Sequence, residues 1–213
     1  MKILISISPE PVEYLLVVQP NTPVKLIRLD TDEKDDKASN DYDLILTTDY
    51  DTLIKLFDGT MSPLTAAGRA NIKDPAPLDF KLPKGRTLDA VTYRNLITFI
   101  QRFFNRFEPE TITMKENNSR VVHGGHAVAL YYDKGFRSSW FLVKKGDQLN
   151  EPNDTNNFPQ AFIVTSGEGF LDMGKGKMLV EEGKSYFIPP ESQHVITTKG
   201  QMTLIWLAWG ENA

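Results

Sequence analysis

The chain has 213 residues, 40% of them hydrophobic, which is enough for one large core or two small ones. Its formal net charge of -4 gives no electrostatic reason to expect a nucleic acid or an anionic membrane as a partner. The absence of cysteine excludes disulfides, thiolate metal sites and cysteine nucleophiles, and it suits a reducing compartment.

The apolar runs along the chain are short. The first, residues 3–7, is too short for a signal-peptide core, and the later ones are interrupted well before the roughly 20 residues that a membrane-spanning helix needs. We therefore expect a cytoplasmic protein without stable membrane insertion.

The first part of the chain has the pattern of short strands. Residues 14–18, 24–29 and 42–47 are apolar or β-branched and are separated by turn-forming residues. The charged run at residues 31–37 lies between two of these strands, and we interpret it as a solvated loop.

The periodicity changes to that of helices after Asp49. This residue is placed to cap a helix that ends at Gly59, and apolar residues at 53, 54, 56 and 57 share one of its faces. A second, short helix is predicted to begin with Ser62 as its cap and Pro63 at its first position, and to end at Gly68.

This segment resembles the central part of the sterol carrier protein family, in which a strand, a helix, a glycine, a second helix and a small-Gly turn follow in that order. The matching residues are Asp43, Ile45, Leu53, Leu56, Gly59, Pro63, Ala67, Gly68 and Ile72, and the match spans roughly residues 12–75. The resemblance implies an α+β domain, which we place at residues 1–110. The family's N-terminal helices are absent, so whether a lipid tunnel is complete stays open.

Residues 88–107 give the strongest helix pattern in the chain, with apolar residues at three- and four-residue spacings. Core packing or a bridge between domains explains such a helix most simply. A lid over a lipid ligand and a membrane-surface helix are the alternatives. The polar stretch at 110–120 follows, and we place the domain boundary there.

The second domain, residues 120–213, has the pattern of an all-β barrel or jelly roll. Short strands separated by Gly- or Pro-containing turns are predicted at residues 128–132, 140–143, 161–165, 169–173, 186–188, 194–197 and 202–209.

Two motifs in this domain resemble those of the cupin superfamily. Gly183, Pro189 and His194 follow the order and spacing of the second cupin motif. Gln160, followed by Gly167, resembles the end of the first motif, with Gln in place of Glu. The resemblance implies a double-stranded β-helix, so the predicted architecture is an α+β domain followed by a cupin-type barrel.

The usual metal ligands of cupins are largely missing. Metal-binding members of the family draw two histidines and a carboxylate from the first motif, whereas residues 146–160 contain no histidine. His194, Gln160 and Asp154 would form a weak set, because an amide oxygen carries no full charge. His123 and His126 are separated by two glycines, which favours a turn over a helix face that aims both rings at one ion.

We therefore expect no cofactor, and hypothesise a small-molecule-binding cupin whose barrel holds a partly apolar ligand without turning it over. The predicted ligand-binding residues are Gln160, His194, Tyr186, Trp206 and Tyr132. No nucleophile with a paired base can be recognised, and no catalytic residue is assigned.

Two other hypotheses stay open. One is a metal-dependent cupin enzyme, of the dioxygenase or isomerase type, that binds Fe, Mn, Ni or Zn through His194, Gln160, Asp154, His123 and His126. The other is a non-catalytic homodimeric scaffold. Whichever function holds, we expect a homodimer, because cupins often pair through barrel faces.

Overall fold

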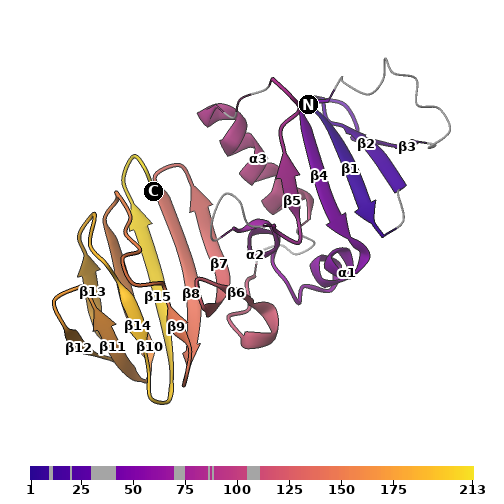
Figure 1. Ribbon diagram of the computed structural model, residues 1–213. Coiled ribbons are helices and arrows are strands. Elements are labelled where there is room, and N and C mark those ends of the chain that lie inside the picture. Colours follow the sequence, from indigo (N-terminus) through magenta and orange to yellow (C-terminus); the bar gives the residue numbers. More distant parts are fainter. Residues whose placement is uncertain are drawn as a thin grey trace. The chain divides into compact units, whose positions relative to one another are not determined.

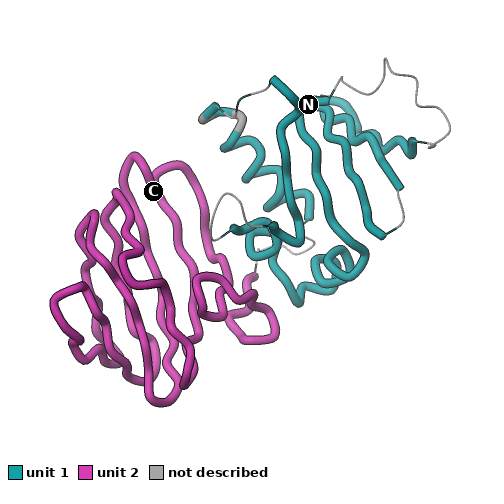
Figure 2. The backbone as a smooth tube through the Cα atoms, in the orientation of Figure 1, with its two compact units in different colours: residues 1–69, 73–106 teal, residues 70–72, 107–213 magenta. Residues whose placement is uncertain are grey.

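The computed structural model describes residues 1–9, 12–19, 21–29, 42–69, 75–85, 87, 89–104 and 111–213. The chain divides into two compact units (Figure 2). Unit 1 comprises residues 1–69 and 73–106, and unit 2 comprises residues 70–72 and 107–213. Within the described ranges, no helix is both long and apolar enough to cross a membrane.

Unit 1 contains a five-stranded sheet with helices against it (Figure 1). Its strands are β1 (Lys2–Ser8), β2 (Val12–Val17), β3 (Lys25–Leu29), β4 (Leu44–Asp49) and β5 (Asp79–Lys81), in the order β3-β2-β1-β4-β5. The pair β1 and β4 is parallel, and the other pairs are antiparallel. The sequence pattern predicted β2, β3 and β4 but not β1, the central strand, whose Ile3, Ile5 and Ile7 alternate toward the core.

The two helices predicted after Asp49 are confirmed. Helix α1 (Tyr50–Asp58) begins where the Asp49 side chain accepts a hydrogen bond from the backbone N–H of Thr52, and it ends at Gly59, which has left-handed backbone. Helix α2 (Pro63–Ala67) is capped by Ser62 in the same way. The strand, helix, glycine and helix order is therefore present, and the resemblance to sterol carrier proteins remains a prediction.

Helix α3 (Ala90–Phe103) lies inside the predicted range of 88–107; residues 88 and 105–107 lie outside the described residues. Its Leu96 and Ile100 belong to the same buried cluster as Ile3 on β1 and Leu56 on α1. The helix therefore contributes to the core of unit 1, as the simplest interpretation of its pattern predicted. Residues 30–41 and 70–74, which include the charged run and Ile72, also lie outside the described residues.

Unit 2 is built from two antiparallel sheets (Figure 1). One has the order β13-β10-β15-β8-β7-β6 and the other β12-β11-β14-β9. The strands are β6 (Arg120–Val122), β7 (Gly125–Asp133), β8 (Phe136–Lys144), β9 (Gln148–Leu149), β10 (Gln160–Ser166), β11 (Glu168–Asp172), β12 (Lys177–Glu181), β13 (Ser185–Ile188), β14 (Val195–Thr197) and β15 (Gln201–Trp209). A short 3-10 helix, η1 (Glu116–Asn118), precedes them.

The pairing of β8 to β15 is that of a jelly roll. The pairs β8 with β15, β9 with β14, β10 with β13 and β11 with β12 are nested inside one another along the chain. This nesting is what results when one long antiparallel ribbon folds over itself into two sheets. The predicted double-stranded β-helix is therefore confirmed for unit 2, and its core contains inward residues such as Phe162, Val164 and Leu204.

Candidate functional site

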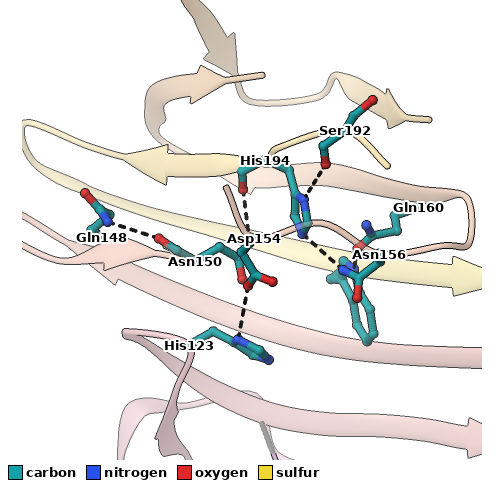
Figure 3. A network of polar contacts seen from close by, with 9 residues as sticks. His123, Gln148, Asn150, Asp154, Asn156, Gln160, Ser192 and His194 are labelled. Atoms are coloured by element: carbon teal, nitrogen blue, oxygen red, sulfur yellow. Dashed lines mark hydrogen bonds and ion pairs between the residues drawn. The ribbon is translucent and has the colours of Figure 1, made fainter. Parts of the chain in front are cut away.

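A polar cluster, made up of Asn150, Asn156, Gln160 and His194, lies where two loops meet next to the first residue of β10 (Figure 3). The loop that leads into β10 is held against the segment before β14 by two hydrogen bonds. The backbone N–H of Glu191 donates to the carbonyl of Asn156 at 2.7 Å, and the N–H of Asn153 donates to Oε1 of Gln193 at 2.8 Å. These contacts place His194, Asn156 and Gln160 close together (Figure 3).

His194 is only 2% exposed, and its hydrogen bonds define its tautomer. Nδ1 lies 3.0 Å from the carbonyl oxygen of Ser192. A carbonyl can only accept, so the proton lies on Nδ1 and the lone pair on Nε2. Asn156 then donates its Nδ2 to Nε2 over a long 3.4 Å.

The pKa of His194 is lowered mainly by burial, which penalises the imidazolium. The Ser192 carbonyl and the nearby Asp154 carboxylate act in the opposite direction, and His123 adds a smaller lowering contribution. At neutral pH His194 is therefore an uncharged acceptor at Nε2.

Gln160 is 1% exposed and is oriented by Trp206. The indole N–H of Trp206 donates to Gln160 Oε1 at 2.7 Å. An indole can only donate, so this bond fixes which end of the amide is oxygen and which is nitrogen. The other end, Nε2, is a buried donor without a hydrogen-bond partner in the part of the chain that the structure describes.

Asn150 joins the backbone of His194 to that of His123 through hydrogen bonds. The sequence analysis did not assign it to the site. Its Nδ2 donates to the carbonyl of His194 at 3.0 Å, and its backbone N–H donates to the carbonyl of His123 at 2.8 Å. Its own carbonyl accepts from Nε2 of Gln148 at 3.1 Å. The left-handed backbone of Asn150, at φ 65°, was a signal that only the folded chain reveals.

The five residues of the predicted metal set do not converge. His123 lies at the tip of the turn between β6 and β7, with Nδ1 3.8 Å from Oδ2 of Asp154, so these two are neighbours. His126 lies on β7, where it contacts Ser119 at 3.3 Å and Glu116 at 3.9 Å. His126 thus lies with Ser119 and Glu116, and its place in a metal site stays a prediction.

The donors also do not fit a divalent metal of the cupin type. Such an ion needs three or four converging nitrogen and oxygen ligands. Within the described ranges, no three His, Cys, Asp or Glu side chains lie close enough together to hold a metal ion. The Gln160 oxygen, in turn, is already held by the Trp206 N–H.

The structure brings some of the predicted ligand-binding residues together and separates others. Trp206 joins Gln160 directly. Tyr186 packs against the barrel core and uses its hydroxyl to accept the backbone N–H of Glu181 at 2.9 Å. Tyr132 is half-buried on β7, and its ring lies 6.0 Å from the guanidinium of Arg137.

Comparison with known proteins finds likenesses of fold only. No protein-family model and no curated protein matches this chain. A cupin 2 conserved barrel domain protein from Salinispora arenicola is 19% identical, with 49% of this chain and 91% of that chain covered and a TM-score of 0.43. A RmlC-like cupin from Shewanella frigidimarina is 17% identical, with coverage of 50% and 93% and a TM-score of 0.43.

A third structure, a putative ethanolamine utilization protein from Salmonella typhimurium, is 18% identical, with 41% of this chain and 71% of that chain covered and a TM-score of 0.36. At these identities and TM-scores the likenesses carry no information on ligand or activity. The jelly-roll assignment of unit 2 rests on its own strand pairing.

Proposed function

We propose that unit 2 binds a small, partly apolar organic ligand at the polar cluster, without turning it over, and that Gln160 and His194 orient this ligand. The observation that carries the proposal is the buried, unpartnered Nε2 of Gln160. Leaving such a donor unpaired costs about 1–3 kcal/mol. A ligand oxygen placed at Nε2 would recover this cost on binding.

The neighbouring groups complement that donor. His194 Nε2 is an acceptor whose only protein partner among the described residues is the long contact with Asn156, so a ligand hydroxyl or N–H can compete for it. The Phe162 ring lies 6.1 Å from the His194 ring and supplies an apolar surface beside the polar groups. One donor, one acceptor and an aromatic ring are typical of an organic-ligand site.

The backbone around the cluster is strained in a way that supports this proposal. His123, Asn150, Asn153 and Glu191 all have positive φ, between 51° and 67°, and all belong to the loops around His194. Such backbone costs about 1–3 kcal/mol per residue and persists at sites where the surrounding structure fixes it. The loops therefore hold their side chains in set positions before a ligand binds.

The test compares metal with organic content in protein purified without chelator. We expect an organic compound to be released on denaturation and identified by mass spectrometry, and to be lost in a Gln160→Met variant. Metal measured by inductively coupled plasma mass spectrometry should be far below stoichiometry. Near-stoichiometric iron, manganese, nickel or zinc that disappears in a His194→Ala variant would overturn the proposal and make the protein a candidate metal-dependent enzyme.

A second candidate role, the homodimeric scaffold, is favoured by the outer face of the six-stranded sheet. Phe187 and Tyr131 are 57% and 45% exposed there, and they lie at the two ends of one outward row whose middle members are the buried Ala161 and Ser138 and the half-buried Leu207. This uncharged row can pair with its own copy without like-charge repulsion. Analytical ultracentrifugation should show a dimer that a Phe187→Asp variant dissociates; a monomeric wild type would refute this role.

A further inference from the structure

Arg137 lies on the inner face of the barrel, in the same row as Gln160. Phe141 and Val143 of β8 belong to the barrel core, and Arg137 has the same parity along that strand. Both Arg137 and Gln160 are register partners of Ala208 on β15, one on each side of it. The two Cα atoms are therefore two strand spacings apart, about 10 Å.

The guanidinium of Arg137 lies over two aromatic rings. Its carbon lies 6.0 Å from the centre of the Tyr132 ring and 5.9 Å from that of the Phe158 ring. No hydrogen bond or ion pair to another described residue accompanies these ring contacts. Cation–π contacts of this kind attract a guanidinium without using its N–H donors, so the donors of Arg137 stay available to a ligand.

We propose that Arg137 is the anion subsite of the ligand-binding site, and that the ligand is a small organic acid whose carboxylate binds this edge. This inference rests on the function proposed above. The row then presents two groups of donors that have no acceptor among the described residues. One is Gln160 Nε2, and the other is the Arg137 fork two strands away. A carboxylate matches the fork with two parallel hydrogen bonds, which a neutral amide cannot reproduce.

Phe158, which covers the row between Gln160 and Arg137, defines the middle of the ligand. Phe158 belongs to one buried cluster with Ala208, so it covers the row between Gln160 and Arg137. A ligand that reaches both groups must cross the Phe158 ring, and its central part is therefore apolar. The ligand class is a carboxylic acid with an apolar body and a hydroxyl or carbonyl at its far end.

The probes are para-hydroxyphenylacetate and its primary amide, which differ only in the charged group. In ¹⁵N-resolved NMR spectra, millimolar acid should shift both the Arg137 Nε–H signal and the Gln160 side-chain amide signals. The amide should bind at least about tenfold more weakly, because a charge-assisted pair is roughly twice as strong as a neutral hydrogen bond.

The variants are Arg137→Gln and Lys134→Gln. Lys134 is exposed on the turn before β8, so its replacement removes the same charge from the same hairpin without changing the inner face. Arg137→Gln should abolish the preference for the acid, and Lys134→Gln should keep it.

Three outcomes would overturn the inference: equal affinity for acid and amide, a preference that survives in Arg137→Gln, or an Arg137 signal that the acid does not shift. If Gln160 responds to both probes while Arg137 is silent, the anion subsite is wrong and the proposed function stands. If Gln160 responds to neither probe, while compounds released from the purified protein also leave it unshifted, the proposed function itself fails.

Discussion

Replacing Gln160 with methionine removes a buried donor that has no partner among the described residues. Methionine has nearly the same length and volume, so the change leaves little cavity. Loss of the unpaired amide should stabilise unit 2 by about 1–3 kcal/mol, and the Trp206 N–H that loses its acceptor should cost a similar amount. The expected net effect is a free energy of unfolding unchanged to within about 1 kcal/mol, together with loss of ligand binding.

The assay is urea denaturation followed by tryptophan fluorescence. All three tryptophans, Trp140, Trp206 and Trp209, lie in unit 2, so the signal reports on this unit alone. Thr198→Val is the matched control, because the buried Thr198 hydroxyl donates to the carbonyl of Glu168 at 2.7 Å and its isosteric removal should destabilise by about 1–2 kcal/mol. If Gln160→Met destabilises as much as the control, Nε2 is paired in the free protein and the reasoning is refuted.

Three further changes test other parts of the structure. Burial lowers the pKa of His194 in the folded protein, whereas the pKa of a histidine in the unfolded chain is about 6.5. The unfolded chain therefore binds the proton more tightly than the folded protein does. The stability due to neutral His194 is complete above about pH 6.5 and falls as the pH decreases toward the lower folded pKa. Urea denaturation at several pH values gives the free energy of unfolding as a function of pH. The decrease below about pH 6.5 that is due to His194 should be absent in His194→Asn, and an unchanged pH dependence in this variant would contradict the assigned burial effect. Gly124→Ala places a Cβ 2.1 Å from the Gln148 carbonyl oxygen at a residue with φ 80°, and it should destabilise unit 2 more than Gly146→Ala does. Gly146 also has positive φ but has open space around it, so its replacement should cost about 1–2 kcal/mol. Equal losses of stability in fluorescence-monitored unfolding would mean that the turn at His123 does not pack against Gln148 as described. Asp49→Ala removes the cap of α1 and should cost unit 1 about 1 kcal/mol in unfolding followed by far-ultraviolet circular dichroism, and no change would argue against the cap.

Local signals in the sequence were sufficient for much of the fold. The caps Asp49 and Ser62 and the terminating Gly59 act within a few residues of the helices that they delimit, so the pattern predicted both helices. The central strand β1 was not predicted, although its buried Ile3, Ile5 and Ile7 alternate with the half-buried Leu4 and Ser6. The short strands β9 and β12 were missed as well, because a strand of two residues, or one with only Val180 buried, has no detectable alternation.

The candidate site was predictable only in part. The spacing of Gly183, Pro189 and His194 pointed to the last histidine, and the position of Gln160 followed from the first motif. Asn150 and Asn156 could not be selected from the several asparagines of their loop, because their roles depend on hydrogen bonds to residues about 40 positions away in the sequence. The contacts of His126 with Ser119 and Glu116 could not be predicted either, because the short spacing between His123 and His126 does not determine which groups each ring faces.

The sequence by itself determined that the C-terminal half is a barrel of short strands and that few metal ligands are available to it. Both follow from residue types and spacing, which are local properties. Only the tertiary structure decided that Trp206 holds the oxygen of Gln160, that Nε2 of Gln160 is a buried donor without a described partner, and that Arg137 occupies the same inner row. These facts depend on strand register, which is fixed by the packing of two sheets around a common core and not by any one segment.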